Sequence, residues 1–285
     1  MLRAPDPADH VIGLACWQGR PALMTRAHRH HDIEINYAVD GALDYLIGGR
    51  RVVAGPGEMV AFWAAIPHQL VGAAPDACVR WLTVPLHIVL GWRMPPATVR
   101  RLLQGDVLTA TAEDRRDADI ALFGQWAADL SSGDEELRHV ALLEIEARLR
   151  RLSTATPAGR RGTPAPGGGS SVEHAAQMAD FIAGSFRDPL TADRIAATVP
   201  MHPHYAMAVF KQVMGTTLGA YLTQCRIAEA QRLLITTGMP VADVAAAAGF
   251  GSQSRFYARF TQACATPPGE YRKLHRGLYR AQGLD

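Results

Sequence analysis

Residues 241–268 read VADVAAAAGFGSQSRFYARFTQACATPP, and this stretch decides the fold of the C-terminal part of the chain. Its first eight residues predict a short alanine-rich helix, and Gly249-Phe250-Gly251 predicts the turn that follows. Ser252 is a favourable N-cap for a second helix over 253–262, whose phenylalanines are expected to face inward. The proline pair at the end of the stretch stops this pattern. The stretch therefore predicts a helix-turn-helix unit whose second helix stands out from its support.

The same pattern occurs once earlier in the chain. Thr191 is a plausible N-cap for a short helix over 192–198, and a turn leads from it to a second helix over 203–214. We expect this second helix to direct three side chains toward the core, namely Tyr205, Val209 and Phe210. A long helix over 218–237 connects the two units. Two such units on one chain could reach successive major grooves, about 34 Å apart, on one side of a duplex.

In the N-terminal part, apolar residues recur at every second position. In residues 33–39, alternate side chains are apolar, and glycines at 41 and 48–49 predict the turns of a hairpin. Short strands with Gly and Pro turns continue to about residue 92 and indicate a barrel or sandwich. From about residue 98 the period becomes helical. One apolar stripe there could pack on the barrel or on a second subunit: Leu142, Ile145, Leu149 and Leu152.

The 249–260 stretch, with Thr266-Pro267-Pro268-Gly269-Glu270-Tyr271-Arg272 after it, resembles the AraC/XylS-type transcription regulators. Residues 226–234 are similar to the connecting helix of that family. Tyr205-Ala206-Met207 and Pro67-His68-Gln69-Leu70 look most like the subgroup that regulates melibiose operons. The resemblance implies a ligand-responsive, sequence-specific DNA-binding regulator, an activator of carbohydrate uptake or catabolism genes, with α-galactosides as the analogy-based guess.

Carried over by position, the resemblance implies DNA contacts from both second helices. In the first unit the expected residues are His202, His204, Met207, Ala208 and Lys211, and in the second they are Gln253, Ser254, Arg255, Tyr257 and Arg259. Gln253 suits adenine, whereas Met207 and Ala208 cannot form the paired hydrogen bonds that read guanine or adenine. The helix over 203–214 is therefore expected to read thymine methyl groups and to use His204.

The stretch from His28 to Gly41 matches the first cupin motif, His-x-His-x3-Glu-x6-Gly, apart from its leading glycine. His28, His30 and Glu34 share one strand face, and Pro67-His68 resembles the histidine of the second motif, although its asparagine is absent. Three imidazoles and a carboxylate suit a divalent metal such as zinc, nickel, iron or manganese. The alternative is that these residues, with Tyr45 and Trp63, bind a polar ligand such as a sugar directly or support the barrel.

These patterns predict an α+β protein. We expect a cupin-like sensor barrel at 1–95, a helical extension at 96–152 that packs on the barrel or serves dimerisation, a Gly/Pro/Ser-rich linker at 153–171, a double helix-turn-helix domain at 172–276, and a tail at 277–285. The expected partners are double-stranded DNA, a small-molecule effector that is a sugar, RNA polymerase and a second copy of the chain.

Composition excludes few functions by itself. The net charge is +2, with its basic excess in the C-terminal part. No apolar run is long enough for a membrane helix, and the N-terminus lacks the pattern of a secretion signal. The four cysteines form no Cys-x-x-Cys pair, so we expect a cytoplasmic protein with free thiols. A cupin enzyme and a metal sensor remain the alternatives to a sugar-responsive regulator.

Overall fold

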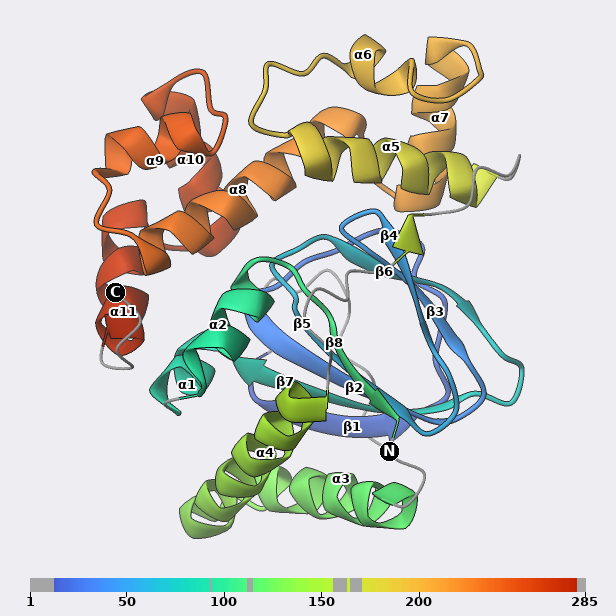
Figure 1. Cartoon of the computed structure of the whole chain (residues 1–285), viewed down its shortest axis with the longest axis vertical. Helices are drawn as coiled ribbons and strands as arrows, with labels where there is room; N and C mark the ends of the chain where they lie inside the picture. Colours follow the sequence, from blue (N-terminus) through green and yellow to red (C-terminus); the bar gives the residue numbers. More distant parts are fainter. Residues whose placement is uncertain (1–12, 93, 112–114, 156–162, 165–170, 281–285) are drawn as a thin grey trace.

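The computed structural model describes residues 13–92, 94–111, 115–155, 163–164 and 171–280. Two antiparallel sheets form a barrel in its N-terminal half (Figure 1). One sheet has the order β1-β7-β2-β5-β8 and the other the order β6-β3-β4-β9. The strands are β1 (Ala15–Gly19), β2 (Asp32–Asp40), β3 (Leu43–Ile47), β4 (Arg50–Ala54), β5 (Glu58–Trp63), β6 (His68–Ala73), β7 (Cys78–Pro85), β8 (Leu108–Thr111) and β9 (Thr163–Pro164).

The alternation in β2 separates the two faces of its sheet, as predicted. Ile33, Ile35 and Tyr37 belong to the core between the barrel and its helices, and the ring of Tyr37 stacks on Phe123 at 6.0 Å. The residues of opposite parity, Glu34, Asn36 and Ala38, face the barrel interior. β2 is therefore the wall between an apolar exterior layer and a polar interior site.

Four helices extend the barrel: α1 (Leu86–Gly91), α2 (Pro96–Leu103), α3 (Arg116–Ser131) and α4 (Glu135–Ala155). The apolar stripe of α4 packs on its own chain, because Ile145, Leu149 and Leu152 are buried in the core that includes β2. A buried ion pair joins the last two helices, with Arg148 donating to Asp119 at 2.7 and 2.8 Å. Helix α4 includes the first three residues of the range expected as a linker. Residues 156–162 and 165–170 of that range lie outside the described residues.

Seven helices form the C-terminal domain: α5 (Ser171–Ser185), α6 (Ala192–Ala196), α7 (Pro203–Met214), α8 (Leu218–Thr236), α9 (Val241–Ala247), α10 (Gln253–Cys264) and α11 (Pro268–Arg280). The pairs α6–α7 and α9–α10 lie at opposite ends of α8 (Figure 1). Thr191 and Ser252 cap α6 and α10 by accepting hydrogen bonds from Arg194 N and Arg255 N. The predicted double helix-turn-helix architecture and the α+β class are confirmed.

One expectation in this domain was wrong, and one helix was not expected. The side chain of Tyr205 is 61% exposed rather than in the core, because Ala206, Val209 and Phe210 already fill the inward face of α7. The α10 helix ends at Cys264, before the proline pair, as expected, but Pro268 then begins α11, a helix that was not predicted. Proline suits the first position of a helix, where its missing N–H leaves no hydrogen bond unmade. α11 packs on α8 and on α1 of the sensor, and it includes residues 277–280 of the expected tail.

None of the helices in the described part of the chain combines the length and apolar character that crossing a bilayer requires.

Candidate DNA-binding surface and ligand site

The outer face of α7 is open to solvent. His202, His204, Ala208 and Lys211 are exposed, and the rings of the two histidines stack at 6.2 Å. Met207 is half-buried and packs against the domain core, so it is the least available of the five expected residues. The exposed Tyr205 joins this face instead. The sequence did not indicate it, because an aromatic residue in an amphipathic helix usually packs inward.

The outer face of α10 carries all five residues that were expected there: Gln253, Ser254, Arg255, Tyr257 and Arg259 are exposed. The opposite side of the helix is anchored by the buried Phe256 and Phe260. Arg259 Nη1 donates to Gln262 Oε1 at 3.3 Å, which adds an exposed amide to the same surface. Both second helices therefore present polar outer faces on buried apolar supports, which is what reading base edges in a groove requires.

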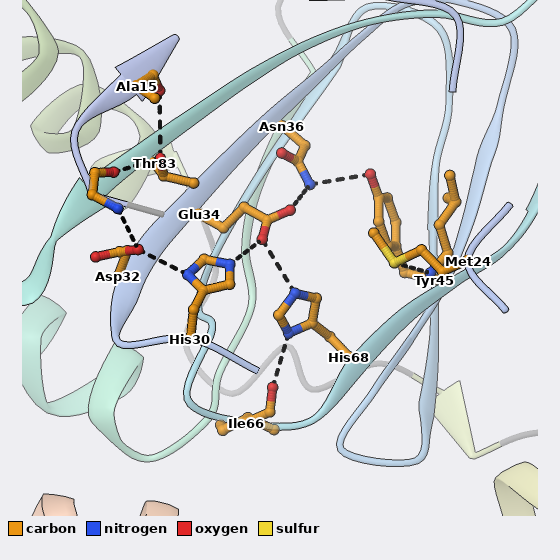
Figure 2. Close-up of polar contacts among 12 residues, drawn as sticks. Ala15, Met24, His30, Asp32, Glu34, Asn36, Tyr45, Ile66, His68 and Thr83 are labelled. Atoms are coloured by element: carbon orange, nitrogen blue, oxygen red, sulfur yellow. Dashed lines mark hydrogen bonds and ion pairs between the residues drawn. The ribbon is translucent and has the colours of Figure 1, made fainter. Parts of the chain in front are cut away.

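Four side chains meet inside the barrel. His28 and His30 come from the segment before β2, Glu34 from β2 and His68 from the start of β6, and all four are buried. Each offers a ligand atom, and these atoms lie within 4.8 Å of one another. Glu34 Oε2 is 3.0 Å from His30 Nε2 and 3.2 Å from His68 Nε2 (Figure 2). The sequence prediction that these residues share one site agrees with this geometry.

A second layer of hydrogen bonds orients the cluster. Asp32 Oδ2 lies 3.0 Å from His30 Nδ1, and Ile66 O lies 3.0 Å from His68 Nδ1. Asn36 Nδ2 donates to Glu34 Oε1 at 2.8 Å and to the hydroxyl of Tyr45 at 3.1 Å, so Tyr45 reaches the cluster through Asn36 (Figure 2). Partners of this kind fix ring orientation and tautomer in metal and polar ligand sites alike.

The pKa values of three members of the cluster are strongly shifted from their usual values. Burial and the nearby His68 lower the pKa of His28 to about 2, so its ring is neutral. Burial opposes the charge on His30, but hydrogen bonds to Asp32 and Glu34 outweigh it and raise its pKa to about 9. Burial likewise opposes the charge on Glu34, yet His68 and His30 hold its pKa well below the usual value.

The donor set fits a divalent cation. Nδ1 of His28 is buried and has no hydrogen-bond partner among the described residues, which leaves a neutral imidazole with an unused lone pair or proton. Together with His28, the residues His30, His68 and Glu34 offer three nitrogen donors and one oxygen donor. This set suits zinc and related metals. When bound, such an ion would supply charge that holds these ligands, or a coordinated polar molecule, in place.

Trp63 lies away from this cluster. It pairs with Ile33 across the sheet, whereas Glu34 pairs with Phe62, so Trp63 is on the outer face of β5. There it lines a cavity of about 460 Å³ between the barrel and helices α5 and α8. Of the residues expected to bind ligand, the structure thus brings together His28, His30, Glu34, His68 and, through Asn36, Tyr45, and it separates Trp63 from them.

One short segment, residues 26–31, contacts both helix-turn-helix units. Ala27 N donates to Met214 O at 2.7 Å, at the end of α7, and His31 Nε2 lies 3.3 Å from Ala263 O, near the end of α10. Arg29 Nη1 donates to Gln231 Oε1 of α8 at 3.4 Å. Alternate residues of the same segment, His28 and His30, point into the barrel cluster. The sequence predicted the inward residues but carried no pattern that indicated the outward ones.

Comparison with known proteins follows this division. A helix-turn-helix domain family matches residues 195–274, and a cupin domain family matches residues 20–85. The chain is 32% identical over 260 residues to the melibiose operon regulatory protein of Escherichia coli strain K12, covering 89% of this chain and 85% of that protein. It is 29% identical over 293 residues to the transcriptional activator NphR of a Rhodococcus species, covering 95% and 84%. These relatives are transcription regulators rather than enzymes, as the helix-turn-helix pair indicated.

Proposed function

Because the chain belongs to the AraC/XylS-type family of transcription regulators, we propose that it binds double-stranded DNA through the outer faces of α7 and α10 and responds to a sugar effector. The observation that carries the DNA-binding surface is the exposure of Gln253, Arg255 and Arg259 on one side of a helix whose other side is fully anchored. Gln253 suits the N6 and N7 atoms of adenine, and the arginines suit guanine or phosphate.

In this proposal α7 reads DNA differently. His204 and Tyr205 offer polar atoms, Ala208 suits a thymine methyl group, and Lys211 and His202 lie where phosphates would pass. The support for this role is that the whole face is exposed while Val209 and Phe210 hold the helix from beneath.

The effector proposal rests on a relative of the chain. A relative that is 32% identical is named for a melibiose operon, so α-galactosides are the first sugars to test. We further propose activation of carbohydrate uptake or catabolism genes through RNA polymerase, and a homodimer. Two exposed leucines of α4, Leu137 and Leu143, are the observation that supports self-association through that helix.

We propose that the 26–31 segment transmits the effector signal. It contacts α7, α8 and α10, so a shift of this segment would move both DNA-reading helices relative to the sensor. Among the described residues no carboxylate forms an ion pair with Arg29, although its side chain is buried. Burying an unpaired guanidinium costs free energy, which keeps the docked arrangement easy to displace.

A band-shift titration tests the proposal. The full-length protein is titrated onto DNA sites selected from a random-sequence pool, at several salt concentrations and with and without a panel of sugars. We expect specific binding that weakens steeply with salt, because phosphate contacts release counterions. We also expect at least one sugar to change the affinity. Binding that is the same for selected and scrambled DNA would contradict a base-reading role for α7 and α10.

A second candidate is a metal-responsive regulator, favoured by the donor geometry of His28, His30, Glu34 and His68. Protein purified without a histidine tag is analysed for bound metal, and the same is done for His28→Ala. The metal-responsive reading expects about one equivalent in the wild type, loss in the variant, and DNA binding that changes with chelation. A metal-free wild type whose DNA binding ignores added zinc or manganese would exclude it.

A further inference from the structure

The barrel interior has little room for a sugar. Three rings inside the barrel are fully buried, those of His30, His68 and Tyr45. The two histidines both contact Glu34, and Tyr45 contacts Asn36. Phe62 packs edge-on to His68 at 4.9 Å and against Tyr45 at 6.4 Å. A disaccharide would have to displace these side chains, whereas a single metal ion would not.

The cavity between the domains has the size that the barrel lacks. Its volume of about 460 Å³ lies within the range of roughly 300–1,000 Å³ typical of small-molecule sites. The barrel and its extension contribute Trp63, Ile66 and Leu103, and the DNA-binding domain contributes Phe186, Glu229 and Arg232. Each domain therefore supplies only part of the wall.

The walls combine apolar faces with charged hydrogen-bonding groups. Trp63 and Phe186 provide aromatic surface, and Trp63 Nε1 has no hydrogen-bond partner among the described residues. Glu229 accepts from Arg187 at 2.7 Å and from Arg232 at 2.8 Å. Across the domain boundary, Arg50 Nε lies 3.3 Å from Asp180 Oδ1. Hydroxyl groups both donate and accept, so they can bond to both members of such pairs, and sugar rings also have apolar faces that pack on aromatic rings.

We propose that the sugar effector binds in this interdomain cavity and not in the cupin barrel, an inference that rests on the proposed function as a sugar-responsive regulator. A ligand seated there contacts α5 and α8 on one side and the loop after β5 on the other. Its binding free energy therefore favours one arrangement of the two domains over others. The histidine cluster is then left as a separate site, which holds the 26–31 segment from the inside.

Gly184 allows the cavity to be filled without disturbing the fold. It lies in α5, lines the cavity, and has no atom within 4 Å of the position that a Cβ would take. Gly184→Leu places a side chain at the cavity wall and improves helix propensity. Gly124→Leu is the matched control, since Gly124 is an exposed helical glycine of α3 that does not line the cavity and meets only Arg80 Nη1 at 3.8 Å. Tyr45→Phe removes the hydroxyl that accepts a hydrogen bond from Asn36 inside the barrel.

The test is a titration of the full-length protein with melibiose, raffinose, maltose and sucrose, followed by thermal shift and calorimetry, with DNA binding measured in parallel. We expect an α-galactoside to raise the melting temperature of the wild type. The dissociation constant should rise at least tenfold in Gly184→Leu and change less than twofold in Gly124→Leu and Tyr45→Phe.

The other outcomes separate the two claims. Sugar binding that survives Gly184→Leu but is lost in Tyr45→Phe would place the sugar in the barrel, overturning the inference and leaving the proposed function intact. No binding of any of the four sugars to a wild type that still binds DNA specifically would overturn both the sugar effector and this site. An equal loss of sugar affinity in Gly184→Leu and Gly124→Leu would also overturn the site, because Gly124 does not line the cavity.

Discussion

Nε2 of Gln231 donates a hydrogen bond to Nδ1 of His31 at 2.7 Å, and this contact joins the middle of α8 to the segment that precedes β2. Burial and the neighbouring Arg29 lower the pKa of His31 to about 4, so the ring is neutral near pH 7 and Nδ1 can accept. Nε2 of the same ring is then free to donate to Ala263 O near the end of α10. One imidazole thus bridges the connecting helix and a DNA-reading helix.

The His31→Ala variant should uncouple the sensor from the DNA-binding domain. It removes both bridges and leaves Gln231 with an unmatched buried donor, which costs about 1–3 kcal/mol in the docked arrangement. We expect specific DNA binding to persist while the effector-induced change in affinity falls at least fivefold, as measured by band shift with and without effector.

Asp76→Ala is the control for this variant, because Asp76 is an exposed sensor residue that forms no hydrogen bond or ion pair with the described residues of the DNA-binding domain. A full effector response in His31→Ala would show that the 26–31 segment does not carry the signal. Loss of DNA binding without effector would instead indicate a role in holding the fold of the second helix-turn-helix unit.

Cysteine reactivity should report on domain docking. Burial raises the pKa of Cys16, Cys225 and Cys264 to about 12, which makes their thiols poor nucleophiles. Cys225 lines the interdomain cavity and Cys264 interacts with Arg29, whereas Cys16 lies in the core between the barrel and its helices. With iodoacetamide at pH 8 and peptide mass spectrometry, we expect the partly exposed Cys78 to react first.

Two variants should shift this labelling in opposite directions. Arg29→Met keeps the packing and removes an unpaired buried charge, so it should slow the reaction of Cys264. His31→Ala weakens docking and should speed the reaction of Cys225 and Cys264 several-fold. Cys16 is the internal reference: if it accelerates equally, the variant has unfolded the whole chain and the docking interpretation fails.

Base reading and phosphate contact can be told apart on α10. Gln253→Ala should cost about 1–3 kcal/mol on the selected site and almost nothing on a site already altered at one adenine. If Arg259 contacts phosphate, Arg259→Ala should weaken binding to all sequences and reduce the salt dependence by about one counterion. Binding constants on a set of single-base operator variants decide this. An equal loss on every variant would remove the base-reading role of Gln253.

The ion pair of the helical extension should contribute strongly to stability. Asp119 and Arg148 are both buried, so Arg148→Ala leaves a buried carboxylate without its partner at a cost of about 3–5 kcal/mol. Urea unfolding followed by circular dichroism measures the change. A double replacement, Asp119→Leu with Arg148→Met, should recover much of the loss, because it removes both charges together. An unchanged midpoint in Arg148→Ala would show that the pair is solvated in solution.

Local patterns predicted most of the C-terminal domain. Helix α7 has the predicted bounds, with proline at its first position, and Ser252 caps α10 as expected. Tyr205 was wrongly assigned to the core because periodicity specifies a face only to within one residue. With Ala206 and Phe210 buried beside it, the inward side of that turn was already full.

The contacts between the domains could not be predicted from the sequence. Period two in the 28–34 stretch indicates that His28, His30 and Glu34 share a face, but it says nothing of what Arg29 and His31 meet on the other side. Their partners lie about 200 residues away on α8 and α10, and no local pattern encodes that docking. Trp63 illustrates the same limit, since its aromatic character indicated a ligand site without indicating which side of the wall it lines.

Hydroxyl-radical footprinting of the full-length protein on its selected site tests the central claim most directly. If α7 and α10 enter successive major grooves, backbone protection appears in two patches about one helical turn apart on one side of the duplex. His204→Ala with Tyr205→Ala should erase one patch and Gln253→Ala with Arg255→Ala the other. A single patch, or two patches that both variants weaken equally, would contradict the account.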